Sequence, residues 1–326
     1  MKISIIGEFN KSLDEGMRNV TFNIHKELIK NHDVLSLDLK KISIMWFIRL
    51  LSFKPQIIHY THGPTVFSII LLYIISKITG SKSVVSTTQP HLSPVLKVVL
   101  FVFRPDLVLA QSDRASTFFE SAGCKTVFLP NGIDTNRFVN ISDSEKRSLR
   151  KKYGINEDIF IILHVGPIKR ERNLKVFCEI QSKCKVQVII IGSTSFGVDK
   201  DVYNSLIESG CIVWVKYFRN IEEIYQMADC YVFPVFKEFS CIDMPLSVLE
   251  AMACNIGVIT SKYQALPKVI KESEGVIFID RHSNIINIVN SNLASFKKSK
   301  NRNKVLSYSW ENITKKLEIY YREIIN

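Results

Sequence analysis

Short apolar runs alternate with longer helical patterns along most of this chain. The β-branched runs KISIIG at 2–7 and SVVST at 83–87 are typical strands, and apolar residues recur at helical spacing over 17–28. Strands that alternate with helices predict a parallel sheet with helices on both faces. Ligands gather at the carboxyl ends of the strands in such sheets, so the loops at those ends are where a site is expected.

Length and charge narrow the classes of function. A chain of 326 residues with 46% apolar content is long enough for two domains. The net charge of +12 favours anionic partners such as nucleotides, phosphorylated substrates or anionic lipid. No basic segment is interleaved with aromatic residues, which argues against nucleic acid. The seven cysteines form no CxxC pair, which predicts reduced thiols and a cytoplasmic setting.

Two apolar segments of the first half raise the question of a membrane. Residues 66–78 and 95–103 are rich in aliphatic side chains but shorter than the roughly 20 residues needed to span a bilayer. They predict helices that are either buried or face a membrane. Lys97 and Arg104 fit shallow contact with an anionic membrane surface. The beginning, MKISIIGEF, is a strand without the apolar core of a signal peptide.

The segment DMPLSVLEAMAC at 243–254 predicts the start of a helix. Pro245 suits a first turn, and Ser247 and Glu250 project from the side opposite the apolar residues. The free N–H groups of a helix start attract a diphosphate, and a carboxylate one turn later can accept hydrogen bonds from ribose hydroxyls. An ordinary amphipathic helix shows the same apolar spacing, so both interpretations remain open.

A basic loop follows the strand IFIILHVG, which ends at Gly166. Lys169, Arg170 and Arg172 crowd this loop just before a helix. Positive charge at the carboxyl end of a buried strand would neutralise a diphosphate leaving group as its bond breaks. The alternative is a solvated charge run.

PLSVLEAMA, between the strand-like CYVFPV and GVIT, resembles the nucleotide-sugar signature of retaining GT-B glycosyltransferases of glycosyltransferase family 4. The stretch from AQSD to NGID at 131–134 resembles the junction between that family's domains. The resemblance implies an α/β fold of two Rossmann-like domains that face one another across a cleft. It places an acceptor-side domain at 1–138, a nucleotide-sugar domain at 139–306, and a helix at 307–326 that crosses back.

The resemblance also implies residue roles in the second domain. Glu250 would hold the nucleotide ribose, and Arg172 takes the place of a family lysine. Pro167 stands where the family has arginine, so Lys169 or Arg170 would supply the first cation. The donor-binding and phosphate-binding residues implied in this domain are Gly166, Arg170, Arg172, Asp243, Met244, Pro245, Leu246, Ser247 and Glu250.

One family position departs from the pattern. The glutamate that contacts the donor sugar would fall at Ile242, so Glu238, moved by an insertion, or Asp243 is expected to replace it. In the first domain, Gly16 at a helix start and His62 are candidates for contact with phosphate or acceptor. The family histidine near the reaction centre falls at Gln89, and His91 is the candidate to replace it.

These observations predict a hexosyl- or related glycosyltransferase that moves a sugar from a UDP- or GDP-sugar to a lipid-linked, saccharide or small-molecule acceptor. Retention of configuration is implied by the family. With no His/Cys cluster at ligand spacing in the sequence, no metal or cofactor is expected, and Arg172, Lys169, Glu238 and His91 are the catalytic candidates. A sugar-nucleotide-binding subunit without activity and an epimerase are the alternatives. The expected place is the cytoplasm, at the inner face of the membrane.

Overall fold

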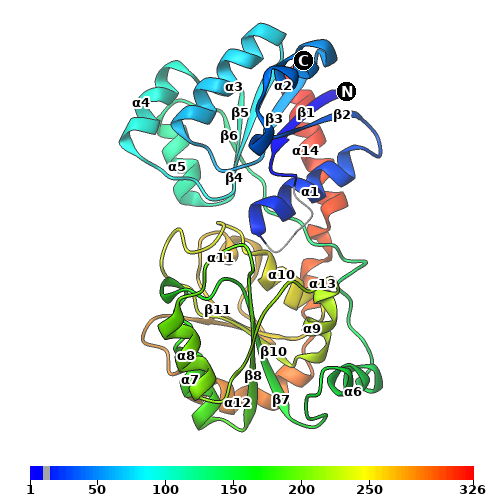
Figure 1. Cartoon of the computed structure of the whole chain (residues 1–326), viewed down its shortest axis with the longest axis vertical. Helices are drawn as coiled ribbons and strands as arrows, with labels where there is room; N and C mark the ends of the chain where they lie inside the picture. Colours follow the sequence, from blue (N-terminus) through cyan, green and yellow to red (C-terminus); the bar gives the residue numbers. More distant parts are fainter. Residues whose placement is uncertain (10–14) are drawn as a thin grey trace. The chain divides into compact units, whose positions relative to one another are not determined.

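The computed structural model describes residues 1–9 and 15–326, which divide into two compact units (Figure 1). The first unit comprises Met1–Gly132, Cys241–Met244 and Trp310–Asn326. The second comprises Ile133–Ser240 and Pro245–Ser309. The boundaries predicted from the sequence, at 138 and 306, lie close to these divisions. The inclusion of Cys241–Met244 in the first unit had no counterpart in the prediction.

The first unit contains six parallel strands in the order β2-β1-β3-β4-β5-β6. The strands are β1 (Lys2–Gly7), β2 (Asp33–Asp38), β3 (Ile57–Tyr60), β4 (Lys82–Thr87), β5 (Leu107–Ala110) and β6 (Thr126–Phe128). The helices are α1 (Gly16–Leu28), α2 (Ile44–Phe53), α3 (Val66–Thr79), α4 (Pro94–Val102), α5 (Asp113–Ser121) and the terminal α14 (Trp310–Ile325), with the 3-10 turn η1 (Leu39–Lys41) before α2.

Right-handed crossovers decide which face of this sheet each helix covers. The step from β1 to β2 runs in one direction along the sheet, and all later steps run in the other. Helix α1 therefore lies on one face, where it packs against α14, and α2 to α5 cover the opposite face. One apolar core joins Leu50 of α2, Leu72 of α3, Leu100 of α4 and Phe119 of α5 to the strands.

The second unit repeats the arrangement with the strand order β12-β11-β10-β7-β8-β9, all parallel. The strands are β7 (Phe160–Val165), β8 (Val186–Gly192), β9 (Ile212–Val215), β10 (Cys230–Phe233), β11 (Gly257–Ser261) and β12 (Val276–Ile279). The helices are α6 (Asp143–Lys152), α7 (Val176–Lys183), α8 (Lys200–Glu208), α9 (Ile221–Met227), α10 (Leu246–Ala253), α11 (Leu266–Val269), α12 (Ile285–Lys297) and α13 (Arg302–Val305), with the turns η2 (Arg170–Arg172) and η3 (Leu306–Tyr308). The predicted fold class, two Rossmann-like α/β domains with parallel sheets, is confirmed.

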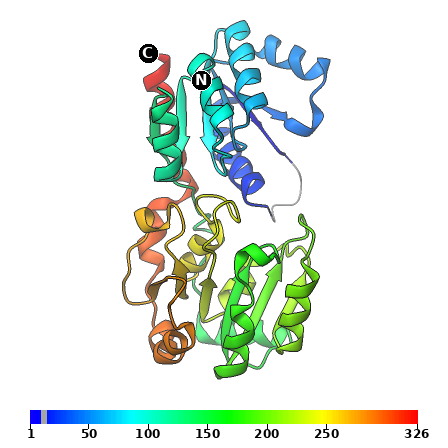
Figure 2. The same cartoon turned by 90° about the vertical axis from the view of Figure 1, so that its left-hand side faces the viewer.

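The C-terminal helix α14 belongs to the first unit, as predicted (Figures 1 and 2). Its buried face contains Trp310, Ile313, Leu317 and Tyr321. The Tyr321 hydroxyl lies 2.6 Å from Nδ1 of His59, a fully buried residue of β3. Burial lowers the pKa of His59 to about 3, so this imidazole is neutral and structural.

The basic run KKSKNRNK at 297–304, whose composition is typical of a solvated linker, is in part buried and anchors neighbouring segments. Asn301 is fully buried and donates to the carbonyl oxygens of Ile256 and Gly275. The Arg302 guanidinium donates to the carbonyl oxygens of Thr135 and Ala253. These side chains satisfy backbone carbonyl oxygens of neighbouring segments, which charge patterning alone does not reveal.

Candidate functional site

Helix α10 lies between β10 and β11, as the sequence predicted for the Pro-Leu-Ser turn. It begins at Leu246, directly after Pro245, which has no side-chain oxygen to cap the first amides. Ser247 Oγ lies 2.7 Å from the hydroxyl of Tyr231, which is also 3.3 Å from the Val165 carbonyl oxygen. The first turn of α10 therefore offers amide donors next to the carboxyl end of β7, as an anion site requires.

Glu250, one turn into α10, is held by a tyrosine that the sequence analysis missed. The Tyr225 hydroxyl donates a 2.7 Å hydrogen bond to Glu250 Oε2. Burial raises the pKa of Glu250 to about 7, while that hydrogen bond and the positive charge of Arg137 act in the opposite direction. The residue as a whole keeps part of its surface exposed. Tyr225 lies on α9, a separate element, and no sequence spacing connects the two residues.

Arg172 is a buried cation without a carboxylate partner. Only 3% of the residue is exposed, and its Nη1 donates to the Ser240 carbonyl oxygen at 3.0 Å. Its guanidinium lies 5.6 Å from the ring centroid of Phe233, and its Nε has no hydrogen-bond partner among the residues that the structure describes. Within residues 1–9 and 15–326, no carboxylate oxygen comes within 4.0 Å of it. A buried charge with an open donor is costly unless an anion balances it.

Gly166 lies directly against Arg172. Its φ of +152° is disfavoured for other residues, and a Cβ atom at Gly166 would lie 2.5 Å from Arg172 Nη2. The glycine therefore lets the guanidinium reach the backbone at the end of β7. Burial, together with the Arg172 charge, lowers the pKa of nearby His164 to about 3, so this histidine stays neutral. Its Nδ1 lies 2.9 Å from the Val232 carbonyl oxygen.

The other two predicted cations of the basic loop differ in their surroundings. Arg170 is exposed and its Nη2 forms an ion pair with Asp201 at 3.0 Å. Lys169 is half-buried, and its Nζ lies 3.9 Å from the position that a Cβ atom at Gly197 would occupy, beside the loop after β8. Of the two cations, Lys169 is therefore directed along the edge of the sheet, and Arg170 toward α8.

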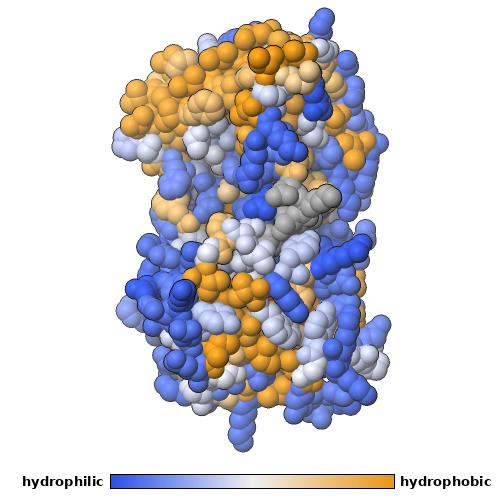
Figure 3. Space-filling model, in the orientation of Figure 1, coloured by the Kyte–Doolittle hydropathy of each residue, from blue (hydrophilic) through white to orange (hydrophobic). Residues whose placement is uncertain are grey.

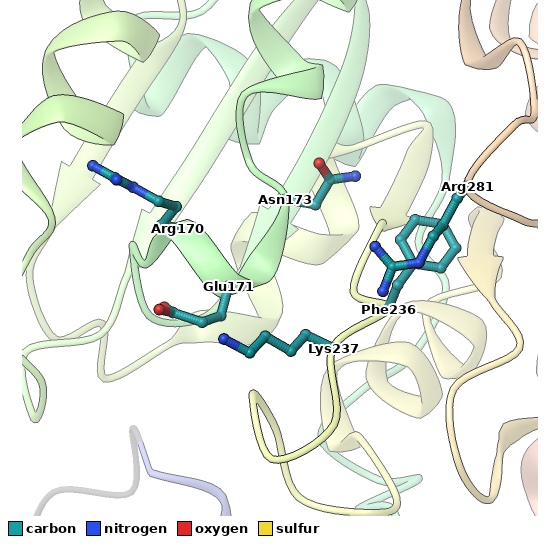
Figure 4. A pocket seen from close by; sticks show the side chains of 6 residues that line it. All are labelled: Arg170, Glu171, Asn173, Phe236, Lys237 and Arg281. Atoms are coloured by element: carbon teal, nitrogen blue, oxygen red, sulfur yellow. The ribbon is translucent and has the colours of Figure 1, made fainter.

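A cavity of about 290 Å³ lies beside this loop (Figure 4). The residues that line it are Arg170, Glu171, Asn173, Phe236, Lys237 and Arg281. Lys237 and Arg281 follow β10 and β12. The rule that pointed to Lys169, that cations just after a buried parallel strand lie at the carboxyl edge of the sheet, could therefore have found them. Arg281 lies over the ring of Phe236, 5.3 Å from its centroid, and Arg170 points away from both (Figure 4). Over the ranges that the structure describes, no three His, Cys, Asp or Glu side chains are grouped to hold a metal ion.

The two candidates for the missing sugar-contacting glutamate lie in different units. Glu238 is exposed in the loop after β10, in the second unit. Asp243 is buried in the first unit, where its Oδ2 accepts a 2.5 Å hydrogen bond from Ser112 and its amide donates to the Thr88 carbonyl oxygen at 2.8 Å. Met244 also belongs to the first unit, and its carbonyl oxygen accepts from Asn131 at 2.8 Å. The predicted donor motif is thus divided after Met244.

The candidates of the first unit lie at the carboxyl edge of its sheet. Gly16 is the first residue of α1, but the Glu15 carboxylate already accepts from the amides of Met17 and Arg18, at 3.0 and 2.9 Å. A Cβ atom at Gly16 would lie 2.9 Å from Ile242 Cδ1, so close packing is a sufficient reason for this glycine. The helix start predicted to meet phosphate is therefore capped by the chain itself.

Charged groups at this edge are paired with each other. Glu8 Oε2 lies 2.9 Å from Lys40 Nζ and 3.3 Å from Arg18 Nε. His62 Nε2 lies 3.8 Å from Glu8 Oε1, and burial lowers the pKa of this half-buried histidine. His91 is exposed in the loop after β4.

Comparison with known proteins gives this geometry a context. The family model for glycosyl transferases group 1 matches residues 145–309, which is half of the chain and includes the basic loop and α10. The alpha-galactosylglucosyldiacylglycerol synthase of Streptococcus pneumoniae is 24% identical over 171 residues, 49% of this chain and 41% of its own length. The chain spans about two fifths of the length of the curated relatives that it matches.

Solved structures match the whole chain. The Anabaena protein Alr3699/HepE in complex with UDP-glucose has a TM-score of 0.79 and 16% identity, with 99% of this chain and 100% of that chain covered. Sucrose-phosphate synthase from Thermosynechococcus elongatus has a TM-score of 0.78 and 15% identity, with 99% of each chain covered. At this identity the likeness establishes the fold.

Proposed function

Because the chain belongs to the family of glycosyl transferases group 1, we propose that it transfers a sugar from a nucleotide-sugar donor to an acceptor. The observation that carries the proposal is the buried Arg172, whose charge no described carboxylate balances. A donor diphosphate would supply the missing anion. The Alr3699/HepE structures, which hold UDP and UDP-glucose, favour a UDP-sugar over a GDP-sugar.

The residues of the second unit take separate roles in this proposal. As the bond between the anomeric carbon and the diphosphate oxygen breaks, the diphosphate gains negative charge. Arg172 and Lys169 stabilise that charge, and the first amides of α10 add donors. Glu250 accepts hydrogen bonds from the ribose hydroxyls. Because Asp243 is buried against Ser112 in the first unit and Glu238 is exposed in the loop after β10, Glu238 is the better candidate to orient the sugar.

Positive side chains would take the place of a metal at the diphosphate, and we propose retention of configuration, as the family resemblance implies. Gly16, His62 and His91 stay predictions for the acceptor side. A lipid-linked acceptor is proposed over a saccharide or a small molecule because the Streptococcus pneumoniae relative is named as a synthase of a diacylglycerol glycolipid. The proposed place of action is the cytoplasmic face of a membrane, which the protein would contact peripherally.

The experiment that tests the donor site measures the melting temperature of the protein with UDP, GDP, UDP-glucose and other sugar nucleotides. A bound ligand raises the melting temperature because it stabilises only the folded state. We expect UDP compounds to raise it in the native protein and in Arg147→Ala, whose arginine is exposed and paired with Asp158. Arg172→Ala should abolish the rise. An equal rise in Arg172→Ala would remove Arg172 from the site.

Turnover separates the proposed transferase from its alternatives. Release of UDP and sugar from the donor would support a transferase. Nuclear magnetic resonance of the product would support retention if the product has the same anomeric configuration as the donor sugar. Tight donor binding without release, across lipid, saccharide and small acceptors, would indicate a binding subunit that has lost its activity. Conversion of the donor sugar without any acceptor would indicate an epimerase.

A further inference from the structure

The outer faces of three helices in the first unit are apolar where solvent-facing helices are normally polar. Each helix buries one apolar stripe in the core, for example Leu72 of α3 and Leu100 of α4, and presents a second stripe outward. The exposed residues, here called the apolar face, are Ile44, Met45, Ile48 and Leu51 of α2, Phe67, Ile74 and Ile78 of α3, and Val95, Val98, Phe101 and Val102 of α4. Ile44 is 81% exposed and Phe67 68% exposed.

These stripes form one surface because the three helices cover the same face of the sheet. All three follow right-handed crossovers in the same direction along the strand order, and α3 packs against α4. Figure 3 shows apolar side chains gathered over the part of the first unit that holds α2, α3 and α4 in Figure 1. A contiguous apolar surface of this kind marks an interaction site, because isolated exposed apolar residues do not gather in this way.

The charges in the segment that carries this face are of one sign, although two of them pair with carboxylates outside it, Lys40 with Glu8 and Lys82 with Asp106. From Leu39 to Pro105 the chain has no Asp or Glu, although the whole protein has 31. The Lys and Arg residues in the same stretch are Lys40, Lys41, Arg49, Lys54, Lys77, Lys82, Lys97 and Arg104. Acidic residues return at Asp106 and on α5, at Asp113 and Glu120, where the apolar face ends.

We propose that the apolar face docks the first unit on a membrane that contains anionic lipid. This inference rests on the proposed function, which includes a peripheral membrane contact, and it names the surface that makes that contact. Apolar residues rimmed by cations are the pattern of a surface that lies in the headgroup region, with aliphatic side chains in the acyl boundary and ammonium groups among phosphates. No helix in the described part of the chain can span a bilayer, so the contact is a shallow one.

A second copy of the chain is a poorer occupant of this face. In a two-fold symmetric dimer the same surface meets itself, so the cations of one copy would face those of the other without a carboxylate between them. The lipid surface offers both the apolar boundary and the opposite charge.

The experiment is flotation of the full chain with vesicles of phosphatidylcholine alone and with vesicles that also contain about 30% phosphatidylglycerol. We expect flotation with the anionic vesicles, much weaker flotation with the neutral ones, and release by high salt, because the charge contribution is screened. Ile44→Ser/Phe101→Ser should weaken the binding about tenfold, because two exposed side chains leave the acyl boundary. Arg49→Glu/Lys77→Glu should weaken it by a similar factor.

Ile319→Ser is the matched control, since Ile319 is 52% exposed on α14, outside the apolar face; it should float like the native protein. The proposal is overturned if the native protein does not float with anionic vesicles, if it floats equally with neutral ones, or if Ile44→Ser/Phe101→Ser keeps full binding. A dimer in solution that this double variant converts to a monomer would identify the face as a self-association surface instead.

Failure of this inference and failure of the proposed function give different results. Sugar release from UDP-glucose in vesicle-free buffer should be unchanged in Ile44→Ser/Phe101→Ser, because neither residue lies in the second unit. If release is normal and flotation is absent, only the membrane contact is wrong. If flotation is normal and no sugar nucleotide is bound or turned over, only the proposed function is wrong.

Discussion

The carboxyl edges of the two sheets have similar topology but differ in how their charges are balanced. At the first edge, Lys40 and Arg18 lie against the Glu8 carboxylate, and Glu15 caps α1 with its own carboxylate. At the second edge, Arg172 is buried without a carboxylate in the described part of the chain, and Pro245 leaves the start of α10 uncapped by a side chain. The first edge balances these charges itself, whereas at the second edge the charge of Arg172 is left for the proposed donor diphosphate to balance.

The difference shows that a Rossmann-like edge is not an anion site by topology alone. Both edges have a strand end, a loop and a helix start, and both have basic residues nearby. What distinguishes them is whether the chain itself supplies the negative charge. Each prediction below changes one of these charges or the backbone that holds it.

The largest effect is expected from Arg172→Ala, which removes the unbalanced cation. Turnover of UDP-glucose should fall by about 10² to 10³-fold, the usual cost of removing a group that stabilises developing charge. The rate of UDP release measures this effect. Arg147→Ala should keep its rate to within about twofold, since exposed ion pairs contribute little.

A stability measurement separates this role from a structural one. Because Arg172 has no carboxylate partner within the described residues, Arg172→Met should not lower the melting temperature of the ligand-free protein appreciably. A large loss of ligand-free stability would mean that the guanidinium serves the fold, and the contrast between the two edges would fail.

Gly166→Ala should have the next largest effect. A Cβ atom would approach Arg172 Nη2 to 2.5 Å, so the guanidinium must move, and the φ of +152° becomes strained. Turnover should fall at least about tenfold, because a displacement of about 1 Å at a charge-stabilising group is costly.

The double variant Gly166→Ala/Arg172→Ala tests whether the glycine acts through the arginine. Its turnover should equal that of Arg172→Ala, because the two effects are not additive when one residue positions the other. Independent, additive losses would show that Gly166 has a separate function.

The pH dependence of donor binding should be of intermediate size. Burial raises the pKa of Glu250 in the folded protein to about 7, above its ordinary value of 4.5. Between these two pH values the carboxyl group is therefore protonated in the folded state and ionised in the unfolded state. Stability from this group therefore falls as pH rises through that window. Ribose hydroxyls are donors and favour the carboxylate, so UDP-glucose affinity should rise about tenfold from about pH 6 to about pH 8.

Calorimetric titration of the native protein and of Glu250→Gln measures this dependence. The amide does not ionise, so the variant should bind more weakly with nearly equal affinity at both pH values. A pH dependence that persists in Glu250→Gln would assign the titration to another group.

The smallest effect on donor binding is expected from Glu15→Ala at the first edge. Loss of this cap should cost about 1 kcal/mol of stability, visible in urea unfolding. The affinity for UDP-glucose should stay within about twofold. Ser142→Ala, which removes the cap of α6 in the second unit, is the matched control. A tenfold loss of affinity in Glu15→Ala alone would show that the first edge also takes part in donor binding.

Local pattern was sufficient for much of the fold. The β-branched runs and the helical spacing predicted the strands and the parallel sheets, because strand and helix periodicity is set by neighbours along the chain. Gly166 and Arg172 were expected at the carboxyl edge because they follow a buried strand, and such positions lie at that edge of a parallel sheet. The role expected of Glu250 came from its place in a helix start and from the family resemblance.

The charge balance of each edge could be decided only by the tertiary structure. The residues that settle it come from distant segments: Tyr225 holds Glu250, Ser112 binds Asp243, and Lys40 pairs with Glu8. The outward apolar face of α2, α3 and α4 likewise could not be separated from a buried one, because periodicity shows that a stripe is apolar but not what covers it. Electrostatic pairing and burial depend on distance in space, which the order of residues along the chain does not give.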